Sequence, residues 1–156
     1  GAPRVHDDGG APLALALSIS HGADWAVAVA SDEARVGVDI ERVEPRAPSF
    51  AREAFADGEL DRWADALGSA VDDPRVVTVA WCAKEALLKI DGSGLRAPLP
   101  AIVPDALELD GGAPGELVRG RLRAPPIGEC RLALAVDEAR AMVILWSATC
   151  GRCTAR

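Results

Sequence analysis

The sequence predicts an α+β fold in which an antiparallel sheet packs against one long, buried helix. Strand-like segments come first and last along the chain with helical segments between them, whereas a parallel sheet would alternate strands with helices. Residues 76–90 are mostly apolar, contain no glycine or proline, and form a run too long for an ordinary strand. The chain has 156 residues, 49% of them hydrophobic, which suits a single domain over residues 1–156 with a sizeable core.

The N-terminal segments predict a loop followed by a hairpin. Residues 1–12 are rich in glycine, proline and aspartate and are expected to form the loop. Residues 13–20 and 25–31 are apolar runs on either side of turn-forming residues 21–24, so they predict two paired antiparallel strands.

Residues 35–41 predict a third strand with two different faces. Because side chains alternate along a strand, Asp39 and Glu41 share one face with Gly37. Two carboxylates this close repel each other unless a cation neutralises them, although paired acids on an edge strand are also frequent without a function. The opposite face is apolar and carries Val36, Val38 and Ile40.

Helices are predicted in the middle of the chain. Residues 49–68 carry helical material, and residues 72–74 (Asp-Asp-Pro) open the long helix with acids at its positive end and proline in its first turn. The glycines in residues 91–94 end it.

The C-terminal part predicts a proline-broken loop followed by strands. The loop covers residues 97–104. Three strands are then expected, around residues 116–123, 129–136 and 141–148.

The polar residues of the long helix fall on two different sides. At 100° per residue, Glu85 and Lys89 share a narrow sector with Trp81, whereas Lys84 lies among apolar residues. Only two of the 17 lysines and arginines are lysines, and both are in this helix. Charges on a buried helix are unfavourable unless they are paired or bound to a ligand. A Glu85–Lys89 ion pair is one explanation, and phosphate binding by compact ammonium groups is the other.

The acids predict a magnesium site. Asp39, Glu41 and Glu85 offer three hard oxygen ligands without a nearby His or Cys, which suits Mg²⁺ with substrate phosphates completing its coordination. His21 follows Ser20 at a strand end, where a ring can reach a ligand, although a lone histidine at a turn is more often incidental. The sequence has neither a phosphate-binding P-loop motif nor a dinucleotide-binding motif.

Composition excludes several other functions. A net charge of −7 argues against nucleic acid as a partner. The apolar runs are shorter than a membrane span, and no signal peptide precedes the first predicted strand, so we expect a cytoplasmic protein. Cys150 and Cys153 form a C-x-x-C pair without the second pair that a zinc ribbon needs, so the cysteines are expected to be incidental thiols.

Three segments together resemble the ordered motifs of 4′-phosphopantetheinyl transferases, closest to the surfactin-synthetase type. They are Ser18-Ile19-Ser20-His21, Val36-Gly37-Val38-Asp39-Ile40-Glu41 and Trp81-Cys82-Ala83-Lys84-Glu85-Ala86-Leu87-Leu88-Lys89. The resemblance extends to Phe55-x-x-x-Glu59 and Gly92-Ser93-Gly94-Leu95, and so covers roughly residues 1–96. Each motif alone is weak, but all three in order are specific.

The resemblance implies a reaction and its residues. Such enzymes transfer the phosphopantetheine arm of coenzyme A to a serine of an acyl or peptidyl carrier protein, with Mg²⁺, and release adenosine 3′,5′-bisphosphate. It implies that Asp39, Glu41 and Glu85 bind Mg²⁺, with Glu85 and Lys89 catalytic and Glu85 helping to deprotonate the serine. The residues that would contact coenzyme A are Ser20, His21, Lys84 and Lys89, with His21 near the 3′-phosphate.

The chain also departs from the family pattern. Residues 1–4 (Gly-Ala-Pro-Arg) stand where many members have Gly-Lys-Pro, and the chain is shorter than two-lobed members. We therefore expect either a homo-oligomer, dimer or trimer, or a domain of a larger synthase such as a polyketide synthase. The alternatives are a non-catalytic half-transferase that serves docking or assembly in a megasynthase, and another Mg²⁺-dependent phosphotransferase.

Overall fold

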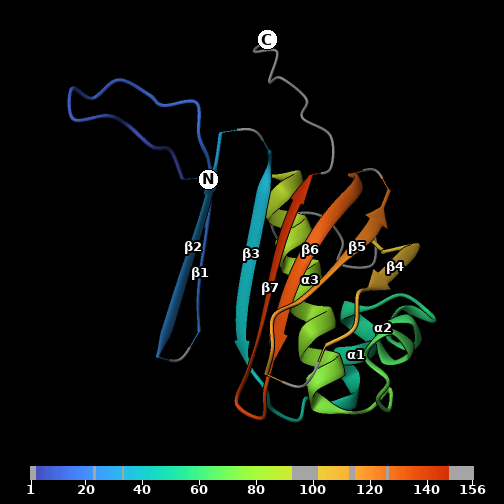
Figure 1. The fold of residues 1–156 in the computed structure, drawn as a ribbon. Coiled ribbons are helices and arrows are strands. Elements are labelled where there is room, and N and C mark those ends of the chain that lie inside the picture. Colours follow the sequence, from blue (N-terminus) through green and yellow to red (C-terminus); the bar gives the residue numbers. More distant parts are fainter. Residues whose placement is uncertain are drawn as a thin grey trace.

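The computed structural model describes residues 3–22, 24–32, 34–92, 102–112, 115–125 and 127–147 (Figure 1). It confirms the α+β class: an antiparallel five-stranded sheet packs against the long helix α3, and a separate two-stranded hairpin stands beside the sheet. No helix in the described ranges is both long enough and apolar enough to cross a membrane.

The large sheet is built from one early strand and four late ones. Its order is β3-β7-β6-β5-β4, and every neighbouring pair is antiparallel. Among the described strands, the early strand β3 is therefore at an edge of this sheet and pairs only with β7. The strands are β3 (Val36–Arg42), β4 (Ala106–Leu109), β5 (Val118–Ala124), β6 (Gly128–Val136) and β7 (Arg140–Ser147).

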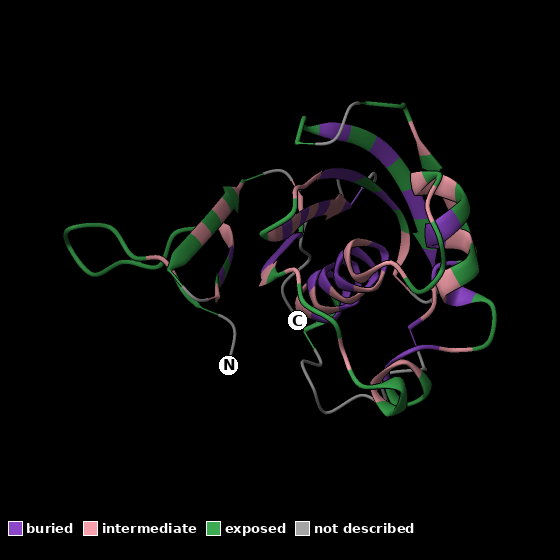
Figure 2. Cartoon of the chain, turned by 90° about the horizontal axis from the view of Figure 1, so that it is seen from below, coloured by how far each residue is buried: buried purple, intermediate pink, exposed green. Residues whose placement is uncertain are grey.

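Helix α3 (Pro74–Asp91) is the centre of the core. It packs mainly against β3 and β7, and most of its apolar side chains are almost completely buried. Figure 2 shows this contrast, with α3 largely buried and the hairpin mostly exposed or intermediate. The shorter helices α1 (Pro48–Ala54) and α2 (Glu59–Leu67) precede α3, and α2 packs against it.

The hairpin of β1 (Ala16–Gly22) and β2 (Trp25–Ser31) lies along the open edge of β3. Two serine hydroxyls of β1 take the place of a neighbouring strand. The hydroxyl of Ser18 accepts the amide of Val38 at 3.0 Å, and that of Ser20 accepts the amide of Ile40 at 3.4 Å. Backbone groups of an edge strand that would otherwise lack partners are thereby satisfied.

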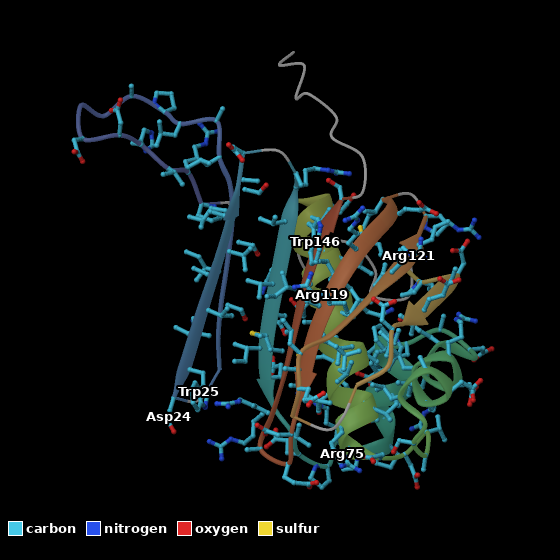
Figure 3. The ribbon with its side chains drawn as sticks, viewed as in Figure 1. Asp24, Trp25, Arg75, Arg119, Arg121 and Trp146 are labelled. Carbon is cyan, nitrogen blue, oxygen red and sulfur yellow. The ribbon has the colours of Figure 1, made fainter. Side chains whose placement is uncertain are left out.

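An arginine from the large sheet fixes the tip of the hairpin. The guanidinium of Arg140 lies over the ring of Trp25, 3.9 Å from its centroid. Figure 3 shows Trp25 and Asp24 together at this end of the hairpin. A contact of this kind contributes roughly 0.5–2 kcal/mol depending on its exposure.

The structure adds one strand to those predicted. Strand β4 lies directly after the proline-rich segment that we expected to be loop, and it was missed because it is only four residues long and half exposed. Of that expected loop, residues 97–101 lie outside the described residues. Residue 148, Cys150 and Cys153 also lie outside them. Cys82 and Cys130 are buried free thiols.

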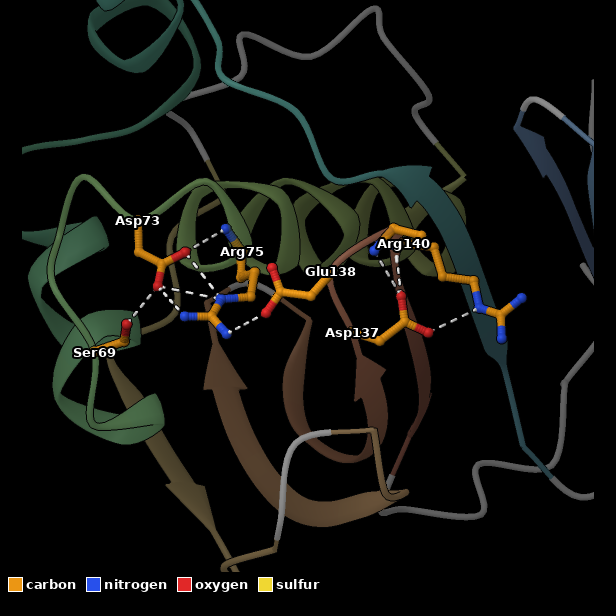
Figure 4. Close-up of polar contacts among 7 residues, drawn as sticks. Ser69, Asp73, Arg75, Asp137, Glu138 and Arg140 are labelled. Carbon is orange, nitrogen blue, oxygen red and sulfur yellow. Dashed lines mark hydrogen bonds and ion pairs between the residues drawn. The ribbon is translucent and has the colours of Figure 1, made fainter.

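Asp73 caps the N-terminus of α3, as Figure 4 shows. Its carboxylate accepts the backbone amide of Arg75 at 2.8 Å, the hydroxyl of Ser69 at 2.7 Å, and the guanidinium of Arg75. The side-chain hydrogen bond from Arg75, foremost, and the other donors hold the pKa of Asp73 well below its ordinary value. The ionised carboxylate therefore stabilises the start of the helix.

Replacing Asp73 by Ala is expected to lower the free energy of unfolding by about 1 kcal/mol, the usual effect of losing a helix cap. The folded-state pKa of Asp73 is strongly depressed, so the stabilisation is complete above the unfolded pKa of about 3.9 and is lost gradually as the pH falls from there through the folded-state pKa. Urea unfolding from pH 7 to pH 3 should show a constant difference between the two proteins down to about pH 4 and a narrowing difference below it. Asp72→Ala, which removes an exposed charge beside the cap, should have a smaller effect. An equal effect would contradict the assignment.

Candidate active site

The candidate site forms where β1, β3 and α3 meet, and Gly37 permits this meeting. A Cβ atom at Gly37 would overlap the backbone carbonyl of Ala86 and also crowd the side chain of Ile90. The strand and the helix can therefore approach this closely only with glycine at this position. The same face of β3 carries Asp39 and Glu41, so the predicted alternation is confirmed and both acids are directed toward α3.

Gly37→Ala is expected to lower the free energy of unfolding by about 3 kcal/mol or more, because the new methyl group meets backbone rather than a movable side chain. Gly9→Ala is the matched control, since a Cβ there would meet only Asp7 Oδ1 at 3.4 Å. Chemical denaturation of both variants measures the difference. A Gly37→Ala protein as stable as the control would refute the close approach.

Asp39 is the most buried of the predicted metal ligands, with only 4% of its surface exposed. Its Oδ1 accepts a hydrogen bond from the hydroxyl of Ser20 at 2.7 Å and an ion pair from Lys89 Nζ at 2.8 Å. Its Oδ2 is buried and has no hydrogen-bond partner among the described residues. A buried carboxylate oxygen without a partner is unfavourable unless something else binds it.

Glu41 and Glu85 lie in the electrostatic field of Asp39. Burial, foremost, and the charge of Asp39 raise the pKa of Glu41, although Arg46, which contacts Glu41 at 3.4 Å, opposes this shift. Burial and the charges of Asp39 and Glu41 likewise raise the pKa of Glu85, while Lys89 opposes them. The three acids therefore form a cluster of mutually repelling charges, which a cation would relieve.

The chemistry of these acids fits a magnesium ion. Within the described ranges, no group of three or more His, Cys, Asp and Glu side chains is arranged closely enough to hold a metal ion by itself. Mg²⁺ does not require such a group, because it usually binds one or two protein carboxylates and completes its shell with water and phosphate oxygens. The unpartnered Oδ2 of Asp39 is suited to be one of these ligands.

The two lysines of α3 lie in different places, as the helical wheel predicted. Lys89 reaches the edge of β3 and also donates to the carbonyl of Val38 at 2.7 Å. Lys84 is buried with Glu59 at 2.8 Å, donates to the carbonyl of Ile102 at 3.1 Å, and lies over the ring of Phe55. The structure therefore does not bring Lys84 to the acids, and its predicted contact with coenzyme A would require this ion pair to open.

The buried Lys84–Glu59 pair yields a double-mutant test. Lys84→Met should lower the free energy of unfolding by roughly 3–5 kcal/mol, because it leaves the charge of Glu59 buried and unpaired. Adding Glu59→Leu should recover much of this loss, since it removes that charge. Urea unfolding of the single and double variants provides the measurement. A double variant less stable than Lys84→Met alone would contradict this explanation.

Two predicted ligand-binding residues of β1 differ in orientation. Ser20 is buried against β3, whereas His21 is exposed and, by alternation, belongs to the opposite face of the hairpin. A pocket of about 360 Å³ lies beside the hairpin tip, with Trp25, Arg140 and the predicted metal ligand Glu41 in its lining.

Sequence reasoning assigned no role to several residues that shape the site. Glu59 belongs to the Phe55-x-x-x-Glu59 motif, but its partner Lys84 is 25 positions away, and the spacing gives no sign of this pairing. Cys82 lies beside the acids: burial, foremost, and the charges of Asp39 and Glu41 raise the pKa of its thiol well above the ordinary value. The alternation of Ser18 with Ser20 was the available signal for the attachment of β1.

Comparison with known proteins identifies the class. Residues 35–124 match the family model described as the 4′-phosphopantetheinyl transferase superfamily. This stretch is more than half of the chain, so the chain belongs to that superfamily, and the predicted family is confirmed.

One curated protein within this superfamily shares measurable sequence identity with the chain. The chain is similar to the 4′-phosphopantetheinyl transferase psf-1 of Bacillus pumilus, with 33% identity over 80 residues, which are 51% of this chain and 33% of the relative. The matching stretch thus spans only about a third of the relative's length.

Proposed function

We propose that this chain transfers the 4′-phosphopantetheine arm of coenzyme A to a serine of an acyl or peptidyl carrier protein in a Mg²⁺-dependent reaction. The observation that carries the proposal is the buried Asp39, with one unpartnered oxygen, among two further acids and a lysine. Superfamily membership supports the reaction class. Phosphoryl transfer needs positioning and charge neutralisation rather than a covalent intermediate, and this cluster offers both.

Each residue of the cluster has its own role in the proposed reaction. Asp39, with Glu41 and Glu85 beside it, would hold Mg²⁺ together with water and phosphate oxygens. The ion would polarise the attacked phosphate and stabilise the leaving oxygen. Lys89 supplies positive charge beside the cluster, and Glu85 accepts the proton of the attacking serine, directly or through water.

Coenzyme A would lie near the exposed end of β1, where His21 can meet its 3′-phosphate. The neighbouring pocket of about 360 Å³ reaches Glu41 and offers room for part of such a ligand. Serine of the carrier protein would enter from the side of α3 on which Glu85 and Lys89 are only partly buried.

A docking or assembly role is the second candidate, and one observation favours it. Among the described residues, three of the five exposed large hydrophobics lie in or just before the hairpin: Leu13, Ile19 and Trp25, with exposures of 44%, 49% and 51%. Such an apolar surface suits contact with another chain, as in a dimer, a trimer or a larger synthase.

The central test incubates the protein with coenzyme A, Mg²⁺ and a panel of apo carrier proteins, followed by intact mass. Glu41→Gln and Glu85→Gln should each reduce transfer roughly 100-fold or more, because several kcal/mol of charge stabilisation depend on the bound cation. Both variants should fold as well as the original protein, since each loses a charge from a repelling cluster.

Glu44→Gln is the matched control, because Glu44 is an exposed glutamate close to Glu41 in sequence. It should transfer normally. Transfer at the original rate by either Glu41→Gln or Glu85→Gln would refute the assignment. Failure of the original protein on every carrier, combined with self-association, would favour the docking role.

A further inference from the structure

The hydroxyl of Ser20 lies between the edge of β3 and the candidate metal site. It accepts the amide of Ile40 at 3.4 Å and donates to Asp39 Oδ1 at 2.7 Å, so its single proton is directed at the carboxylate. Ser20 is only 8% exposed, which keeps water from competing for these contacts. A buried hydroxyl with both an incoming and an outgoing hydrogen bond has little freedom to rotate.

Asp39 Oδ1 has a second donor on the other side. Lys89 Nζ donates to it at 2.8 Å and is itself held by the carbonyl of Val38 at 2.7 Å. The carboxylate is thus fixed through one oxygen by residues of β1 and α3. Its other oxygen, Oδ2, is buried and has no hydrogen-bond partner among the described residues.

We propose that Ser20 is a positioning residue for the metal site: by fixing Asp39 Oδ1, together with Lys89, it presents Oδ2 to a divalent cation. This inference rests on the proposed function only in taking Asp39 as a cation ligand. It gives Ser20 a role different from the direct contact with coenzyme A that the family resemblance implies. Partners that orient a metal ligand commonly change metal affinity 10–100-fold when removed.

Ser18 is the comparison that separates positioning from simple attachment of the hairpin. Its hydroxyl accepts the amide of Val38 at 3.0 Å, just as that of Ser20 accepts the amide of Ile40. Both serines are buried, at 4% and 8% exposure. Only Ser20 also donates to Asp39. Removing either hydroxyl weakens the attachment of the hairpin to β3, but only removal of the Ser20 hydroxyl also takes a hydrogen bond from the carboxylate of Asp39.

The experiment measures Mn²⁺ binding by electron paramagnetic resonance on the full chain, alone and with coenzyme A. Ser20→Ala should weaken Mn²⁺ binding about 10-fold. Ser18→Ala should leave it unchanged while lowering the thermal midpoint by a similar amount. Ser20→Thr, which keeps the hydroxyl, should restore the affinity for Mn²⁺.

In the transfer assay, Ser20→Ala should raise the Mg²⁺ concentration that gives the half-maximal rate, and the rate should largely recover at saturating Mg²⁺.

Each outcome decides the inference. Equal losses of Mn²⁺ affinity in Ser20→Ala and Ser18→Ala would reduce Ser20 to attachment of the hairpin, and unchanged affinity in Ser20→Ala would overturn the inference outright. Mn²⁺ binding that survives Asp39→Asn would also overturn it, because the cation would then lie elsewhere. If Mn²⁺ binding depends on Asp39 and Ser20 but no carrier protein is modified, the proposed function fails while the positioning role stands.

Discussion

The close approach of β3 to α3 at Gly37 is the constraint on which the site depends. The backbone carbonyl of Ala86 occupies the space that any larger side chain at Gly37 would need. Asp39 lies two residues further along the same face of β3, where its charge acts on the carboxyl group of Glu85 on the helix. The packing of the core and the geometry of the acid cluster therefore depend on one contact: a strand that stood further from α3 would separate the acids as well as open the core.

Backbone groups at the open edge of β3 have side chains rather than another strand as hydrogen-bond partners. Some of the side chains that stabilise this edge therefore also contact the acid cluster. A sixth backbone-paired strand would instead satisfy these backbone groups with its own amides and carbonyls. Serine at alternate positions of β1 supplies acceptors for the amides of Val38 and Ile40, while Lys89 supplies a donor for the carbonyl of Val38. The hydroxyl of Ser20 then has its proton left for the carboxylate.

Patterns local in sequence were sufficient to predict much of the fold. Alternation placed Gly37 and Asp39 on one face, and the limits of α3 followed from Asp73, Pro74 and Gly92. Pairings between distant segments were beyond reach, because nothing in the spacing of Lys84 and Glu59, or of Ser20 and Asp39, indicates that they meet. Strand β4 was missed for a related reason: four half-exposed residues carry little pattern, and their pairing with β5 defines them.

The two lysines of α3 show how similar ion pairs can differ in what they permit. The side chains of Lys84 and Glu59 are 0% and 1% exposed, so their charges are sealed from solvent and exchange with a ligand would first require the core to open. The side chain of Lys89 is 28% exposed, and its partner Asp39 still has a buried oxygen without a hydrogen-bond partner in the described structure. Only the second pair is open to a ligand without unfolding of its surroundings. The two lysines of one helix thus differ in that the charge of Lys84 is enclosed and that of Lys89 is partly exposed, and the apolar neighbours of Lys84 account for the difference.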